Sequence, residues 1–207
     1  MNYANRLKEG KPEKRKVRKQ REISYPDPSE VRTFGQKNTV HVMAGIPCSH
    51  KSSYIEMMNP VTNIPIIGFD LAMEATYPAT DYMHSYFKYI DAGQEGKDII
   101  STVIHDDFVR HAQTKSSFII DMTTLKIDTL LDWVDKAREY DMRVRVILMH
   151  TPLKECLEAN ENRDGKTIPP QVIQQMWERS QLKYFDEVIK DFDDVSINHV
   201  GSTKHYD

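Results

Sequence analysis

The residues that most directly suggest chemistry form the loop 45–52, which reads Gly-Ile-Pro-Cys-Ser-His-Lys-Ser. It matches the Walker A pattern G-x-x-x-x-G-K-[ST], except that His50 replaces the second glycine. Such a loop turns backbone N–H groups toward a phosphate, and the helix after it adds the positive end of its dipole. Lys51 would then reach the β- and γ-phosphates of ATP, and the Ser52 hydroxyl would ligate Mg²⁺.

The surroundings of this loop favour a phosphate site over a chance match in a surface loop. The apolar run Thr39–Ala44 before it predicts a buried strand, and a helix is expected from about residue 50 to before Pro60. His50 leaves two possibilities open: it is strained in a glycine-like dihedral, or its imidazole donates to a phosphate. The predicted nucleotide-binding residues of the loop are Gly45, Ser49, His50, Lys51, Ser52 and Ser53.

Two acids follow apolar runs that predict strands. Asp70 comes after the run 64–69, and Asp121 ends the run 117–121. Ligands of α/β sheets bind outside the carboxyl ends of the strands, so both acids are expected at the same crevice as the phosphate loop. Asp70 could accept the proton of an attacking hydroxyl or cap a helix. Asp121 could hold Mg²⁺ or be a cap or turn residue.

A polar loop at 160–167 lies between two expected helices and has the composition of a lid. A lid brings a cation to the transferring phosphoryl group only when the substrate is bound. Arg163 is preferred to Lys166 for this role, and the alternative is a solvated surface loop.

Other residues with chemical potential are read as structural. Tyr82, Tyr86, Phe87 and Tyr89 are spaced like core or acceptor-pocket residues, and core packing is favoured. His105 lies in a helical stretch beside two aspartates, where consecutive residues do not share a face, so a solvated helix surface is expected.

The order of the predicted elements indicates an α/β fold. Expected strands alternate with expected helices, which implies a parallel sheet covered on both faces. The predicted strands are Thr39–Ala44, 64–69, 117–121, 143–149 and 195–200. The predicted helices are 50–59, 81–113 with a break near Gly93 and Gly96, 127–137, 153–160 and one opened by Pro169 and Pro170.

Composition indicates a cytoplasmic protein without membrane segments. No apolar stretch approaches the roughly 18 to 20 residues that span a bilayer, and no apolar segment follows the basic N-terminus as in a secretion signal. Two cysteines, Cys48 and Cys156, make no disulfide framework.

Charge divides the chain into a basic arm, 1–37, and a P-loop domain, 38–207. Residues 1–22 carry nine Lys or Arg against three Glu, a balance of +6, which leaves −9 for the rest of the chain. The arm is expected to be flexible, because it has few apolar residues. It could attract a phosphate backbone, or it could be a solvated leader without a partner.

These features in this order resemble the kinase domain of phage-type polynucleotide 5′-hydroxyl kinases, within the P-loop kinase superfamily. The resemblance spans roughly residues 40–200 and is strongest in the stretch 162–169, with the helix that follows it. It also rests on the loop 45–52, Asp70 and the sequence Asp121-Met122-Thr123.

The resemblance implies a five-stranded parallel sheet with helices on both faces, and ATP and Mg²⁺ as cofactors. Lys51 and Ser52 would bind nucleotide and metal, Asp70 would be the general base, and Arg163 would clamp the donor phosphates. The family usually has an arginine one turn after the base, to grip an acceptor phosphate. That position is Met73 here.

Three functions remain open from the sequence. The first is a kinase for a nucleic-acid end, most simply a polynucleotide 5′-hydroxyl. The second is a kinase for another hydroxyl: a hydroxymethylated base in DNA, a nucleoside or a small metabolite. The third is a P-loop module that binds nucleotide or nucleic acid without turnover.

Overall fold

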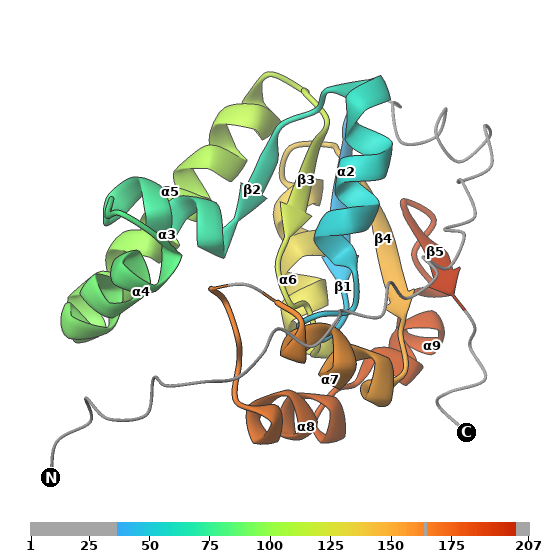
Figure 1. Ribbon diagram of the computed structural model, residues 1–207. Coiled ribbons are helices and arrows are strands. Elements are labelled where there is room, and N and C mark those ends of the chain that lie inside the picture. Colours follow the sequence, from blue (N-terminus) through green and yellow to red (C-terminus); the bar gives the residue numbers. More distant parts are fainter. Residues whose placement is uncertain (1–36, 164, 202–207) are drawn as a thin grey trace, which may run out of the picture.

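A computed structural model describes residues 37–163 and 165–201, and their framework is a five-stranded parallel sheet (Figure 1). The strand order is β2-β3-β1-β4-β5, and every neighbouring pair is parallel. The strands are β1 (Thr39–Ala44), β2 (Ile66–Gly68), β3 (Phe118–Asp121), β4 (Arg143–His150) and β5 (Val195–Gly201). The predicted basic arm lies outside the described residues, apart from its last position.

Helices cover both faces of this sheet, as the alternation of strands and helices predicts. They are α2 (Lys51–Thr62), α3 (Phe69–Thr76), α4 (Tyr82–Asp91), α5 (Gly93–Gln113), α6 (Ile127–Arg138), α7 (Leu153–Glu161), α8 (Pro170–Glu178), the 3-10 turn η2 (Leu182–Tyr184) and α9 (Phe185–Ile189). None of the described helices combines the length and the apolar character needed to cross a bilayer. The sequence-based prediction of fold class is therefore confirmed.

Alternate residues of the central strands fill two separate cores, because successive side chains of a strand point to opposite faces. On one face Met43 packs with Ile147 and with Tyr54 and Met58 of α2. On the other face Val42 belongs to a larger core built with α5, α6 and α9. All six residues of β1 are buried, so both faces of the strand meet protein, although polar Thr39 and His41 alternate with Val40 and Val42.

Figure 1 shows two groups of helices near the carboxyl ends of the strands. Helices α3 and α4 gather beyond the β2 edge, and α7 and α8 lie at the carboxyl ends of the strands. Residues of α3, α4 and α7 line a cavity there, at the place where ligands of α/β sheets are expected.

Two predicted boundaries were wrong. Helix α2 continues two residues beyond Pro60, where the sequence predicted an earlier end. A proline so close to the helix end removes one donor from the last turn and leaves the preceding turns intact. The helix ends instead at Asn63, which adopts the left-handed conformation with φ of 46° and donates its N–H to the carbonyl of Asn59.

The second strand is shorter than predicted, and Asp70 does not end it. Strand β2 stops at Gly68, where an added Cβ would lie 3.0 Å from the carbonyl oxygen of Asp121. Phe69 then begins α3, because the next residues can bury Ala72 and Met73. Asp70 consequently lies in the first turn of a helix whose N-cap is Gly68.

Candidate active site

The loop between β1 and α2 folds tightly around Gly45. A Cβ there would lie 2.5 Å from Ser49 Oγ and 3.1 Å from the Cβ of Met149, so only glycine fits. Ser49 is buried, and its backbone carbonyl accepts a hydrogen bond from Thr151 Oγ1 at 3.0 Å. Gly45 and Ser49 thus fix the shape of the loop from its buried side, while His50 is exposed.

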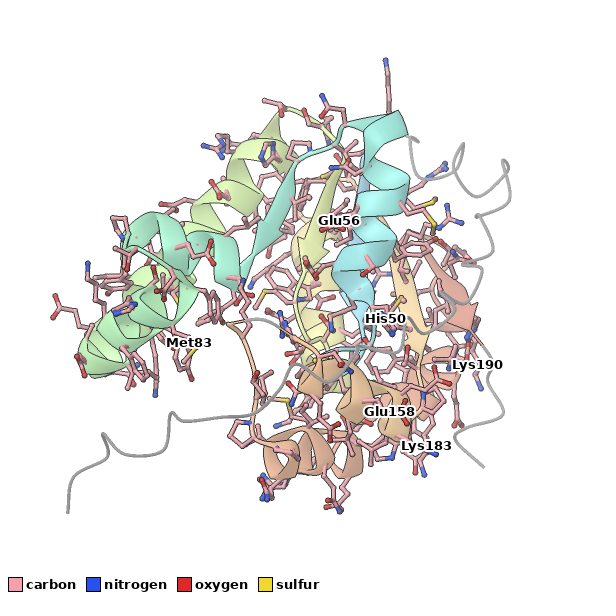
Figure 2. All side chains as sticks on the ribbon, in the orientation of Figure 1. His50, Glu56, Met83, Glu158, Lys183 and Lys190 are labelled. Atoms are coloured by element: carbon pink, nitrogen blue, oxygen red, sulfur yellow. The ribbon has the colours of Figure 1, made fainter. Side chains whose placement is uncertain are left out.

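His50 occupies the glycine position of the Walker A pattern in a glycine-like conformation. Its φ of 66° and ψ of 20° are left-handed, and it is the N-cap of α2 without a side-chain capping bond. Cys48 has a positive φ of 63° as well. The left-handed conformation costs a non-glycine residue roughly 1 to 2 kcal/mol of conformational energy. The exposed imidazole lies at the end of α2 that faces α7 in Figure 2.

Lys51 is buried and folds back over the loop. Its Nζ donates hydrogen bonds of 2.9 Å to the carbonyl oxygens of both Gly45 and Ile46. Burial lowers the pKa of the Lys51 ammonium from 10.5 to about 8, and the carboxylate of Asp121 offsets part of that shift. The cation is therefore kept at the start of α2, where a bound phosphate would meet it.

Ser52 and Asp121 meet at the carboxyl end of β3. Ser52 Oγ donates a hydrogen bond of 3.2 Å to Asp121 Oδ2. Burial raises the pKa of Asp121, opposed by the charge of Lys51 and by the bond from Ser52. A hydroxyl and a carboxylate are hard oxygen ligands that suit Mg²⁺, which takes few protein ligands and completes its shell with phosphates and water. These two side chains fit a magnesium site.

Asp70 is oriented by groups from two other elements. Tyr82 Oη of α4 donates a hydrogen bond of 3.0 Å to Asp70 Oδ1, and Lys166 Nζ lies 3.4 Å from Asp70 Oδ2. Burial is the main cause that raises the pKa of the Tyr82 hydroxyl, and the charge of Asp70 raises it further, so the hydroxyl stays a donor. Helix α3 shows no side-chain capping bond, so Asp70 does not act as the cap that was considered from the sequence.

Lys166 joins the 160–167 loop to α3, through Asp70 and Glu74, and to α4, through Tyr82. Its ammonium lies 3.8 Å from the centre of the Tyr82 ring and 3.3 Å from Glu74 Oε1. No local sequence pattern predicts this contact, because 96 residues separate Lys166 from Asp70. Arg163, which was preferred to Lys166 for the lid, lines the cavity, and Lys166 contacts Asp70.

The predicted residues converge on one cavity of about 630 Å³ at the carboxyl end of the sheet. Its lining includes all the predicted site residues except Gly45 and Ser49: His50, Lys51, Ser52, Ser53, Asp70, Asp121 and Arg163. Tyr82 lines the cavity too, and with Tyr86 and Tyr89 it also packs against the core, as expected. Phe87, which was expected to pack in the core, is instead 55% exposed.

The strand order, the phosphate loop between β1 and α2 and the cavity above it are those of the P-loop kinase fold. The chain belongs to the AAA domain family, which it matches over residues 40–185. No curated protein is similar enough in sequence to count as a match.

Solved structures share this fold at low sequence identity. A chain of the Pnkp1/Rnl/Hen1 RNA repair complex aligns with a TM-score of 0.60 and 20% identity, over 77% of this chain and 47% of that chain. The AvrRxo1-ORF1:ORF2 complex with ATP gives 0.62 and 10%, over 84% and 57%. The PezAT toxin–antitoxin system of Streptococcus pneumoniae gives 0.55 and 13%, over 83% and 74%. The chain thus spans about half the length of the first two, and the likeness concerns the fold.

Proposed function

We propose that this protein is an ATP-dependent kinase that transfers the γ-phosphate to a hydroxyl group, with the 5′-hydroxyl of a polynucleotide as its acceptor. The observation that carries this proposal is the position of Asp70. Its carboxylate is held by Tyr82 at the wall of the same cavity that the phosphate loop lines. A carboxylate there can serve a hydroxyl that attacks a bound phosphate.

The phosphate loop would hold the donor. Lys51 leaves the carbonyl groups of Gly45 and Ile46 and pairs with the β- and γ-phosphates, while backbone N–H groups at the start of α2 surround them. Ser52 and Asp121, which are already in contact, would hold Mg²⁺, and the ion would supply positive charge beside the phosphates. His50 and Ser53 line the same side of the cavity.

Transfer then needs a base and a counter-charge. The oxygen of the acceptor hydroxyl bonds to the γ-phosphorus, and Asp70 accepts the proton of that hydroxyl. The bond between the γ-phosphorus and the β–γ bridging oxygen breaks, and ADP leaves with that oxygen. Tyr82 holds the Asp70 carboxylate in place through its hydroxyl. Arg163 lies on the lid side of the cavity and neutralises the charge on the transferring phosphoryl group.

A nucleic-acid acceptor is supported by the +6 balance of residues 1–22. A basic segment ahead of an acidic domain raises the local concentration of a polyanion near the site. On this proposal the arm contributes to acceptor binding and takes no part in the chemical step.

A second candidate, transfer to another hydroxyl, is supported by the burial of Met73. Its side chain is fully buried in the core, so α3 offers no cation one turn after Asp70 for an acceptor phosphate. An acceptor without a phosphate beside its reactive hydroxyl would not need a cation on α3. A hydroxymethylated base in DNA, a nucleoside or a small metabolite has this character.

A transfer assay with γ-labelled ATP and Mg²⁺ separates these candidates. The panel should contain 5′-hydroxyl DNA, 5′-hydroxyl RNA, DNA with hydroxymethyluracil and free nucleosides. We expect label on the 5′-hydroxyl strands and none with Lys51→Ala. Label on another acceptor alone would select the second candidate, and ATP binding without transfer to any acceptor would select a non-catalytic module.

A further inference from the structure

Asn160, in the last turn of α7, is a polar residue that is almost completely buried. Its exposed fraction is 1%, although the sequence placed it at the start of a polar loop. Burial of an amide is unfavourable unless its donor and acceptor groups are paired. The partners of the Asn160 side chain therefore indicate what this residue contributes to the protein.

The Asn160 amide closes the 160–167 loop by bonding both backbone groups of Ile168. Asn160 Nδ2 donates a hydrogen bond of 2.6 Å to the carbonyl oxygen of Ile168. Asn160 Oδ1 accepts a hydrogen bond of 2.9 Å from the N–H of Ile168. One side chain thus fastens the two ends of the loop together. Because the amide makes two bonds to the same residue, it fixes the orientation of the backbone there as well as its distance.

Arg163 is held within this loop by its own backbone groups. Its N–H donates a hydrogen bond of 3.2 Å to the carbonyl oxygen of Asn160. Its carbonyl oxygen accepts a hydrogen bond of 3.1 Å from Thr167 Oγ1. Thr167 directly precedes Ile168, so the residue that holds the Arg163 carbonyl is next to the residue that the Asn160 amide fixes. The backbone of Arg163 therefore depends on Asn160 from both sides.

The same amide contacts the phosphate loop. Cys48 Sγ lies 3.8 Å from Asn160 Oδ1, a distance at which a thiol makes a weak hydrogen bond. Cys48 and Arg163 both line the catalytic cavity, whereas Asn160 does not. Asn160 therefore links the loop that would hold the donor phosphates to the loop that carries Arg163, from a position outside the cavity.

We propose that Asn160 is a positioning residue, which holds the 160–167 loop against the phosphate loop and keeps the guanidinium of Arg163 at the donor phosphates. The amide touches no substrate and acts through Arg163. Charge that is fixed in place stabilises a transition state without rearrangement at the moment of transfer. This inference rests on the proposed kinase function, which it deepens by naming the residue that places the lid cation.

Limited digestion with trypsin tests the attachment of the loop without measuring transfer. Cleavage after Arg163 or Lys166 reports opening of the loop, and cleavage after Arg145, in the interior strand β4, reports unfolding of the whole domain. Asn160→Ala removes two hydrogen bonds, so loop cleavage should be at least about fivefold faster than in the wild type. Glu158→Ala is the matched control and should leave the rate unchanged, because Glu158 is exposed on the same helix (Figure 2).

Asn160→Asp is the second variant, because it keeps an acceptor for the N–H of Ile168 and loses only the donor to the carbonyl of Ile168. It decides the outcome if Asn160→Ala is also cut faster after Arg145. Unchanged loop cleavage in a variant that stays folded overturns the proposal. Faster cleavage after Arg145 in both variants overturns it as well, since Asn160 would then support the whole fold rather than the loop.

A double-mutant cycle tests whether Asn160 acts through Arg163. Asn160→Ala should lower kcat about tenfold in the wild-type chain but less than about twofold in the Arg163→Ala chain, with the KM for ATP changed less than kcat. Equal losses in both chains would show that Asn160 acts independently of Arg163, and the positioning role would be overturned. Absence of transfer by the wild-type chain would instead refute the kinase function, and the digestion would still decide whether Asn160 holds the loop.

Discussion

Replacing Lys51 with methionine should abolish transfer and change how stability depends on pH. The side chain is buried, so methionine keeps an unbranched apolar stem in its place and removes the ammonium. The pKa of Lys51 is about 8 in the folded protein, against 10.5 for a solvated lysine. The folded state therefore binds fewer protons than the unfolded state between these two values.

The sign and size of the effect follow from this difference. Below about pH 8 Lys51 is charged in both states, and its burial costs about 3 kcal/mol, the equivalent of the shift. This cost decreases as the pH rises from the pKa of Lys51 in the folded state toward its pKa in the unfolded state. Between about pH 7 and pH 9.5, the wild-type chain should gain roughly 2 kcal/mol relative to Lys51→Met.

Urea denaturation of both proteins across this pH range measures the effect. Subtracting the two free energies of unfolding cancels every group that both chains share. Lys88→Met is the control, and its difference should change much less because that lysine is exposed on α4. If the difference between wild type and Lys51→Met stays flat with pH, the buried-ammonium account of the phosphate loop is refuted.

Three further substitutions probe the rest of the site. Arg163→Ala should lower kcat at least about a hundredfold and change the affinity for ATP less, and a change confined to the KM for ATP would make Arg163 an ordinary binding contact. Tyr82→Phe should lower kcat about tenfold without affecting ATP binding, because Asp70 loses an orienting bond, and Tyr86→Phe serves as its control. His50→Gly should raise the free energy of unfolding by about 0.5 to 1 kcal/mol in thermal denaturation, because glycine adopts a φ of 66° without strain. A lower melting temperature would show that the imidazole stabilises the loop.

Much of the fold was predictable because strands that are buried on both faces have recognisably apolar sequences. Strand β3 and the second half of β4 are apolar without alternation, since both sides of these segments meet a core. The phosphate loop was predictable for a related reason. Its chemistry depends on a short contiguous pattern between one strand and one helix.

The predictions failed where the determining contacts are distant in sequence. Asp70 was placed at a strand end, because the sequence alone does not reveal that Gly68 packs against the backbone of Asp121. Lys166 of the 160–167 loop and Tyr82 of α4 both contact Asp70, and no local sequence pattern predicts these contacts. A cavity between α5 and α6 was not predicted either, because residues of several separate elements line it.

Replacing Asp70 with asparagine tests the proposed mechanism most directly. The amide keeps the size of the side chain and can still accept the bond from Tyr82, but it cannot take a proton from a hydroxyl. Glu74→Gln, one turn further along α3, is the matched control, because Glu74 also contacts Lys166. Phosphate transfer to a 5′-hydroxyl strand should be measured beside ATP binding for each variant.

We expect Asp70→Asn to fold and to bind ATP normally while transfer falls by at least about a hundredfold, the usual contribution of a general base. Glu74→Gln should retain transfer within about threefold, in keeping with the small contribution of an exposed ion pair. Near-normal transfer by Asp70→Asn would show that Asp70 is not the general base, even if the phosphate loop proved essential.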